Sequence, residues 1–295
     1  MDESVDKPEF AWQPLTPRGV AAFARASLGR LFLVQFAVAI LAAATLAWFL
    51  GTRWFPVVSA AIEQLPAHGE IRSGRLDLPG ISVRPLAENR LLSVAIDLSH
   101  QGEARNPAHL QVEFGRGDIQ LLSLFGALKA PYPRNWVIAF NRIDLEPWWG
   151  AWVPPILAIA TGGTLTGLLI VWAGLATLYS IWAWLIAFFA NRELTLTGSW
   201  RLAGAALMPG ALFMTGALFS YGVGAMDLVQ LLVVCVLHFV IGWTYLVLAT
   251  LACPKQTVPG SDRANPFTVP AKEAAQAASK TQEKQPENPF HTSHD

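Results

Sequence analysis

A stripe of polar residues interrupts an otherwise apolar run near the end of the chain. Its members are Asp227, Gln230, His238 and Tyr245. At 100° per residue, the four side chains fall within about 80° of one another on a helix. Where an apolar run of this length crosses a membrane, a histidine within it is costly unless it faces protein or water, and it marks a functional site by default. The stripe is therefore the candidate intramembrane polar site.

Two roles for His238 follow from its position. It could form a hydrogen bond with a neighbour such as Gln35 and so fix the packing of helices. It could instead take part in transport, because imidazole exchanges a proton near neutral pH. Asp227 lies at the edge of the apolar run, which favours a helix start over a proton carrier. The packing role is favoured for His238, and both roles stay open.

No other residue pattern indicates catalysis or metal binding. The histidines of the polar insertion, His68, His100 and His109, have no metal-ligand spacing, and no catalytic or nucleotide-binding motif is present. Carboxylates in the insertion alternate with apolar residues, as on solvated strand faces. We therefore predict no catalytic, cofactor or metal site, and an enzyme is not favoured.

The composition indicates which elements position the stripe. Apolar residues make up 53% of the chain and charged residues only 14%, against roughly a quarter charged in soluble domains. Four runs reach the ~20 apolar residues that cross a bilayer: Leu31–Leu50, Pro154–Ala190, Leu202–Gly224 and Leu228–Ala252. The chain is predicted to be an α-helical membrane protein with about four transmembrane helices. Its net charge of zero indicates no nucleic-acid partner.

The predicted organisation has seven parts. They are a cytoplasmic N-terminal segment with a short amphipathic helix (1–30), transmembrane helix 1 (31–51), an extracytoplasmic β-rich domain (52–151), a long transmembrane helix 2 (152–190), transmembrane helices 3 (201–222) and 4 (227–252), and a disordered cytoplasmic tail (253–295). The run 154–190 would measure about 55 Å as one helix. One long helix is favoured over two spans, because no charge interrupts it.

The insertion between the first two spans has the pattern of a small sheet. Polar and apolar residues alternate in Leu92–Leu98, Leu110–Phe114 and Asp118–Leu121, and Glu70–Leu78 is a further candidate around Ser73-Gly74. Alternation of period two is typical of half-buried strands. A mainly antiparallel sheet is expected, lying between helices 1 and 2.

The distribution of arginines predicts the orientation. With four spans, Arg18, Arg25 and Arg30 share one side with Arg192 and Arg201. Short basic flanks stay cytoplasmic, whereas a long loop crosses largely regardless of its charge. Both termini are therefore expected in the cytoplasm, with the protein in the cell membrane, here a bacterial inner membrane.

Short strings carry a resemblance to a known family. They are Ile71-Arg72-Ser73-Gly74-Arg75-Leu76, Ile96-Asp97, and Ser199-Trp200-Arg201-Leu202-Ala203 leading to Leu207-Met208-Pro209. In these strings and in layout, the chain resembles an uncharacterised bacterial family of four-span membrane proteins with an extracytoplasmic insertion. Some of its members are labelled maltodextrin-utilisation protein, and the membrane part also resembles the Yip-type membrane domain. The resemblance implies one anchor, an external domain and three further spans.

The expected function is that of an accessory or scaffold subunit in the cell envelope. The absence of site motifs beside a substantial folded insertion favours this class, with the lipid bilayer and other membrane or envelope proteins as partners. The alternative is a transporter component that uses the polar face of helix 4. A second polar stripe on another span would favour transport, and the sequence has none. A membrane-embedded enzyme is the third class.

Overall fold

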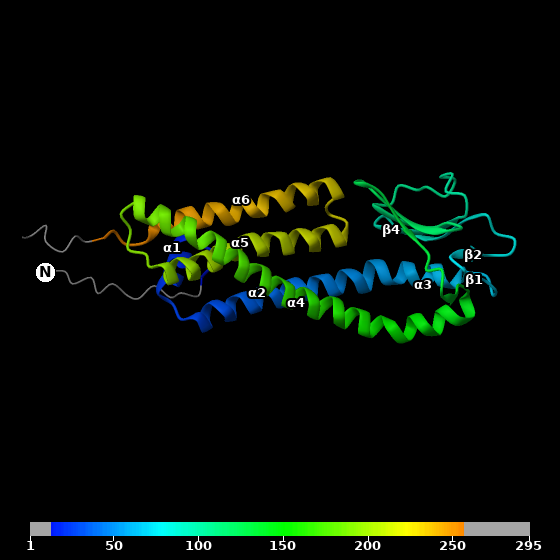
Figure 1. The fold of residues 1–295 in the computed structure, drawn as a ribbon. Coiled ribbons are helices and arrows are strands. Elements are labelled where there is room, and N and C mark those ends of the chain that lie inside the picture. The colour runs from blue at the N-terminus through cyan, green and yellow to red at the C-terminus, as the bar shows by residue number, and fades with distance from the viewer. Residues whose placement is uncertain (1–12, 257–295) are drawn as a thin grey trace, which may run out of the picture. The chain divides into compact units, whose positions relative to one another are not determined.

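The computed structural model describes residues 13–256, and residues 13–254 belong to one compact unit (Figure 1). Its helices are α1 (Pro17–Ala22), α2 (Leu28–Phe49), α3 (Phe55–Glu63), α4 (Arg142–Phe189), α5 (Leu196–Val223) and α6 (Leu228–Ala252). Its strands are β1 (Glu70–Arg72), β2 (Arg75–Asp77), β3 (Val83–Glu88), β4 (Leu92–Asp97), β5 (Leu110–Phe114), β6 (Asp118–Ser123), β7 (Gly126–Pro131) and β8 (Val137–Ala139). The tail predicted to be disordered lies outside the described residues from 257 onward, as does the start of the N-terminal segment up to residue 12.

Within the described residues, four helices are long and apolar enough to cross a membrane. The first runs without a break from Leu28 to Glu63, because a π-helical turn at Leu50–Trp54 joins α2 to α3. The others are α4, α5 and α6, and all the strands lie in the chain between the first and the second helix. Four long apolar helices with a small β region between them are therefore confirmed, and they suggest a membrane protein.

Both helices that flank the insertion are longer than expected. Residues 55–63 form α3 rather than part of the β-rich domain, and α4 begins at Arg142 instead of residue 152. Asn141 caps α4 by accepting a hydrogen bond from the backbone N–H of Asp144 at 3.0 Å. The whole run up to Phe189 is one helix, which Figure 1 shows as curved. Prolines 147, 154 and 155 lie within it and remove backbone donors, which favours bending.

The helix α5 is the centre of the bundle formed by α1, α2, α4, α5 and α6. Small side chains let its neighbours approach closely, as in other membrane bundles. A Cβ atom added to Gly210 would lie 2.5 Å from the carbonyl oxygen of His238 in α6, and one added to Gly204 would lie 3.1 Å from Leu31 of α2. Leu202 and Met208 of α5 are fully buried. The glycines thus set the spacing of the bundle.

The N-terminal helix packs onto this bundle. Val20 and Phe23 are fully buried in a core cluster that they share with Leu202 of α5 and Leu246 of α6. The apolar side of the predicted amphipathic helix therefore faces the other helices of the bundle.

Residues 64–141, called the sheet domain here, contain two sheets rather than one. Five strands lie in the order β3-β4-β5-β6-β7, and three short strands in the order β2-β1-β8. All pairs are antiparallel except β4 with β5, which are parallel. A parallel pair needs a connection of about a dozen residues. The connection between β4 and β5, residues 98–109, is long enough for this purpose.

The strands with clear alternation were predictable, and the others were not. β4, β5 and β6 coincide with the alternating runs, and β1 and β2 form a hairpin around Ser73 and Gly74, which have positive φ angles of 52° and 75°. By contrast, every residue of β7 is exposed, and β3 contains Pro85 and a change of register. Such strands lack an alternating pattern. One side of β4 and β5, including Val94 and Ile96, faces the apolar core of the domain.

We predict that Gly210→Ala destabilises the protein while Gly216→Ala does not. The new methyl group at 210 must push the backbone of α6 away, which costs about 1–3 kcal/mol, typical of overpacking. At Gly216 nothing lies within 4 Å of the added Cβ, and alanine favours the helix by up to ~1 kcal/mol. Thermal unfolding of the two purified variants in detergent tests this. Equal unfolding temperatures would mean that α5 and α6 do not meet at Gly210.

Candidate functional site

Two members of the predicted stripe form the start of α6. Asp227 is its N-cap, and its carboxylate accepts a hydrogen bond from the backbone N–H of Gln230 at 2.7 Å. The side chain of Gln230 in turn accepts one from the backbone N–H of Asp227 at 2.9 Å. This reciprocal capping box satisfies two backbone donors at the helix end. Asp227 and Gln230 therefore have a structural role in this state.

Tyr245 lies toward the other end of α6. Its hydroxyl donates a hydrogen bond to the backbone carbonyl of Leu15 at 2.7 Å. The tyrosine thus holds the segment that precedes α1 against the bundle. The structure accordingly does not bring the four stripe residues together as one site, although they belong to the same helix.

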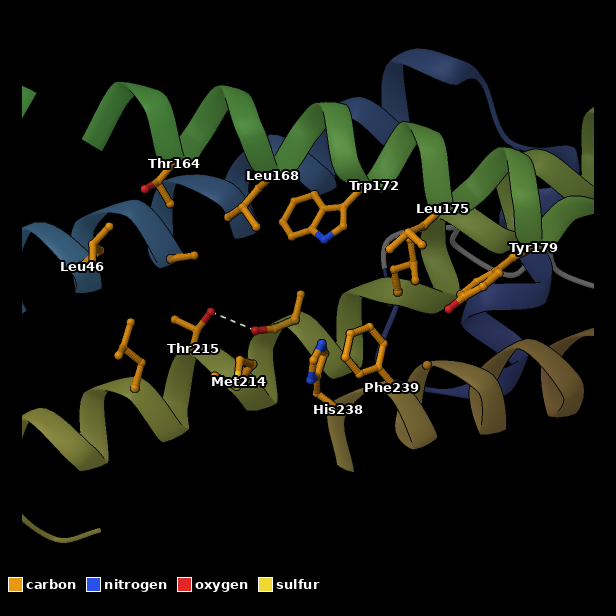
Figure 2. Close-up of a pocket in the computed structure, with 15 residues that line it drawn as sticks. Leu46, Thr164, Leu168, Trp172, Leu175, Tyr179, Met214, Thr215, His238 and Phe239 are labelled. Carbon is orange, nitrogen blue, oxygen red and sulfur yellow. Dashed lines mark hydrogen bonds between the residues drawn. The ribbon is translucent and has the colours of Figure 1, made fainter. Parts of the chain in front are cut away.

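His238 lies in the middle of α6, and Figure 2 shows its ring turned toward α4. Its Nδ1 atom is buried and has no hydrogen-bond partner among the described residues. Gln35, the partner considered for it, instead donates to the backbone carbonyl of Gly204 at 3.4 Å. His238 and Gln35 therefore do not form a hydrogen bond, because the side-chain amide of Gln35 is bonded to the backbone of Gly204 instead.

The ring of His238 borders a cavity of about 240 Å³ within the helix bundle (Figure 2). Residues from α2, α4, α5 and α6 line it, and most of them are apolar; the polar ones are Thr164, Tyr179, Thr215 and His238. The apolar ones include Leu46, Leu168, Trp172, Leu175, Met214 and Phe239. No carboxylate or cationic side chain lines the cavity. It can therefore hold an apolar group but offers no charge for an ion.

The sheet domain holds a second polar group that sequence reasoning missed. Ser93 and Asp97 on β4, and Gln111 and Glu113 on β5, share the side of the sheet opposite the apolar core. They are buried, Asp97 fully and Glu113 with only 2% of its surface exposed. The expectation that these carboxylates lie on a solvated strand face is therefore wrong. The reason is the connection 98–109, which folds back over that side of the sheet.

His100, in this connection, joins the two carboxylates of neighbouring strands. Its Nδ1 atom is hydrogen-bonded to Glu113 of β5, and its Nε2 atom lies 2.7 Å from Asp118 of β6. A Cβ atom added to Gly115 would fall 1.8 Å from Nε2, so only glycine leaves room for the ring there. We name His100, Glu113 and Asp118 the histidine–carboxylate cluster.

The cluster controls the ionisation of its histidine. Burial by itself lowers the pKa of His100, but the hydrogen bonds that its ring forms to Glu113 and Asp118, and the negative charges of these carboxylates, outweigh burial and raise the pKa above its ordinary value. For Asp97, burial acts to raise the pKa, and hydrogen bonds from the backbone of Gly102 and from Ser99 outweigh it and lower the pKa. The covered face of the sheet is thus held together by charge-assisted hydrogen bonds.

Further polar side chains complete this covered face. Asn106 donates to Glu88 and, at 2.6 Å, to the hydroxyl of Ser93. Gln111 donates to the backbone carbonyl of Ala104 at 3.1 Å. These bonds hold both halves of the connection on the sheet. No group of three metal ligands with suitable geometry occurs in residues 13–256. The hydrogen bonds of the histidine–carboxylate cluster instead support the connection on the sheet.

The sheet domain is fixed to the helix bundle by direct contacts. Nδ1 of His109 lies 2.7 Å from the hydroxyl of Tyr221 in α5, and their rings stack. Burial and the nearby charge of Arg90 lower the pKa of His109. Arg90 also donates to the backbone carbonyl of Gly224 at 3.2 Å and to that of Met226 at 3.4 Å, in the turn between α5 and α6. The two parts are therefore joined as one body rather than by a tether.

The chain matches no protein-family model, and comparison with curated proteins and with solved structures finds no match. The family resemblance drawn from short strings of sequence stays a prediction.

We predict that His100→Gln destabilises the sheet domain in a pH-dependent way. The raised pKa of His100 means that the folded protein binds its proton more tightly than the unfolded chain. The stabilisation is then fully present below the ordinary pKa of histidine, ~6.5, and is lost as pH rises through the folded value. The variant should be less stable by roughly 3 kcal/mol at low pH, because a buried carboxylate loses its partner.

Unfolding temperatures of the purified variant and wild type, measured between about pH 5.5 and pH 8.5, test this prediction. The matched control is His68→Gln, because His68 is exposed. The difference in unfolding temperature between wild type and His100→Gln should narrow as pH rises. The corresponding difference for His68→Gln should stay near zero. A difference that widens with pH would show that His100 is neutral in the folded protein.

Proposed function

We propose that the protein is an integral membrane protein of a bacterial inner membrane that acts as an accessory or scaffold subunit for other envelope proteins. In this proposal both termini are cytoplasmic and the sheet domain lies outside. Arg25 pairs with Glu193 at 3.2 Å, and Arg201 donates to the backbone carbonyl of Ala26 at 2.6 Å. The basic residues thus gather at the end of the bundle opposite the sheet domain (Figure 1), as cytoplasmic flanks do.

The observation that carries the proposal is an apolar helical projection. Phe49 of α2 stacks on Tyr221, with 5.9 Å between ring centroids, so α2 ends level with the last turns of α5. The helix continues to Glu63, and Trp149 of α4 donates to the hydroxyl of Ser59 at 2.9 Å. The helix α3 and the first part of α4 therefore extend past the turn that joins α5 to α6 (Figure 1).

This projection leaves large apolar side chains uncovered. Ile143 is 64% exposed, Trp148 51% and Trp152 47%. Because α5 spans 28 residues, or about 42 Å, it is already long enough to cross the bilayer by itself. The projecting side chains then lie outside the hydrocarbon. Exposed apolar patches outside a membrane are typical of protein interaction sites, and tryptophan is enriched where binding energy concentrates.

A second exposed apolar group supports the position of the bilayer surface. Leu124 and Phe125, at the tip of the β6–β7 hairpin, are 62% and 78% exposed. Ser123 pairs with Leu110, which follows His109 at the contact with Tyr221. The tip is therefore at the level where α5 ends. Side chains of this type insert readily into the interfacial layer of a bilayer.

The contacts favour this function over transport. Asp227 and Gln230 cap α6, and Tyr245 holds the N-terminal segment. Among the four stripe residues, only His238 has a buried polar atom without a hydrogen-bond partner. A pathway for a polar substrate needs polar groups in sequence across the membrane, and the lining around His238 is mostly apolar and has no carboxylate, lysine or arginine.

We predict a cytoplasmic C-terminus and an external sheet domain. A reporter that is active only in the cytoplasm should be active when fused after residue 295 and inactive when inserted at Gln101, which is exposed in the connection 98–109. A reporter active only outside should give the opposite pattern. An external C-terminus would contradict the four-span topology.

We predict that the projection contacts another protein. A photo-activated cross-linking residue in place of Trp152 should give an adduct with a second polypeptide in intact cells. The matched control is Ile170, which lies on the same helix and is 67% exposed but faces lipid in this proposal. Mass spectrometry of the adduct identifies the partner and distinguishes a second copy from another chain. Protein adducts in equal yield at both positions, or none at Trp152, would contradict the proposal.

A further inference from the structure

A polar pocket lies where the segment before α1 crosses the last turns of α6. Residues of that segment form one wall and residues of α6 the other, among them Gln13, Thr16, Arg18, Leu248 and Ala252. Its volume of about 630 Å³ is in the ordinary range of ligand pockets. The bundle continues beside it, because α1 packs against α6 (Figure 1).

The wall formed by the N-terminal segment is held in place. Tyr245 of α6 donates a hydrogen bond to the carbonyl of Leu15 at 2.7 Å. Val20 and Phe23, which follow the segment, are fully buried in the bundle core. The pocket is therefore part of the fold, and a ligand does not have to order this wall.

Arg18 gives the pocket a positive charge without a counter-ion. Within residues 13–256 its side chain has no ion pair and no hydrogen bond, whereas Arg25 pairs with Glu193 at 3.2 Å. No carboxylate lines the pocket. The planar guanidinium group matches the oxygens of a phosphate, and the side chains of Gln13 and Thr16 add polar groups beside it.

An apolar groove along α6 leads to this pocket, and Leu248 lines both. Val236, Val240 and Trp243 line the groove further along the helix, at the spacing of three and four residues that places side chains on one face. Val236 is 66% exposed and Val240 53%. The other helices of the bundle therefore leave this face of α6 open.

The groove has about the length of one leaflet of a bilayer. From Cys235 to Leu248, its first and last residues, α6 rises about 20 Å at 1.5 Å per residue. Half of a ~30 Å hydrocarbon core is about 15 Å. Because α6 ends at Ala252, the polar pocket lies at the level of lipid head groups when α6 crosses a bilayer.

The charge of the pocket restricts the head group. A zwitterionic lipid carries an ammonium group beside its phosphate. That group would be close to Arg18, which repels it, and no carboxylate lines the pocket to pair with it. A phosphate head group of net negative charge meets no such repulsion.

We propose that a phospholipid of net negative charge binds here, with its phosphate at Arg18 and one acyl chain in the groove along α6. The site requires only that α6 crosses a bilayer. It lies at the end of α6 that is remote from the turn contacted by Arg90. It is therefore independent of the docking role proposed for the projecting helices.

Native mass spectrometry of the full-length protein in detergent tests the proposal, because it resolves each bound lipid. The probes are dioleoylphosphatidylglycerol, which is anionic, and dioleoylphosphatidylcholine, which has the same chains and a zwitterionic head group. Dissociation constants for the first bound lipid come from titration. The anionic lipid should bind roughly fivefold more tightly, the effect of one basic residue on binding to anionic lipid.

Two arginine variants locate the head group. In Arg18→Gln the preference for the anionic lipid should vanish. The matched control is Arg25→Gln, which removes the same charge from the same end of the bundle but does not line the pocket. It should keep the preference. Arg18 is exposed, so its substitution should leave the unfolding temperature of the lipid-free protein unchanged.

Two valine variants locate the acyl chain. Val240→Trp adds bulk in the groove and should weaken the binding of both lipids without changing their ratio. The matched control is Val233→Trp, because Val233 is 54% exposed on the same helix and does not line the groove. It should bind both lipids as wild type does.

Four results would overturn the proposal. The first is equal affinity of wild type for the two lipids. The second is a preference that survives in Arg18→Gln or is lost equally in Arg25→Gln, since the attraction would then come from the overall charge. The third is equal lipid binding by Val240→Trp and Val233→Trp. The fourth is binding that appears only when residues 2–12 are deleted, which would assign the groove to that segment.

Discussion

A polar group that leaves water must find a hydrogen-bond partner, and this requirement shapes every part of the protein. In the bundle it is met by caps and by close backbone contacts, such as the amide of Gln35 on the carbonyl of Gly204. In the sheet domain it is met by the connection 98–109, which supplies His100 to Glu113 and Asp118. Within the described residues, six buried side-chain nitrogens are exceptions, and Nδ1 of His238 is one of them.

The same requirement explains how the sheet domain, which has no disulfides, is held against the helix bundle. Arg90 and His109 use the free carbonyls and the tyrosine hydroxyl at the end of α5, where backbone groups would otherwise be unpaired. The sheet domain and the projecting parts of α3 and α4 therefore move with the bundle. A fixed apolar surface of this kind suits a scaffold, because docking then costs little conformational entropy.

Sequence patterns predicted the elements with strong periodicity and missed those without it. The apolar runs gave the four long helices, and alternation gave β4, β5 and β6. The edge strand β7 has no buried face and so leaves no pattern. The start of α4 was missed because the charge-free apolar run begins only at Pro154, whereas the first turns of the helix, from Arg142, carry charged residues and leave no hydropathy signal. Asp227 as a helix start was correctly favoured, and its box with Gln230 is a local motif.

The sequence alone determined the apolar helices, because length and hydropathy are properties of the chain itself. Only the tertiary structure decided which polar residues meet. Glu113 has the pattern of a solvated strand residue, and it is buried because a loop between two parallel strands returns over it. The side chains of Gln35 and His238 could form a hydrogen bond with each other but do not. The reason is that α5 approaches Gln35 at Gly204 and His238 at Gly210, two different points along the helix. Such outcomes depend on distances between segments far apart in the chain, which local periodicity does not encode.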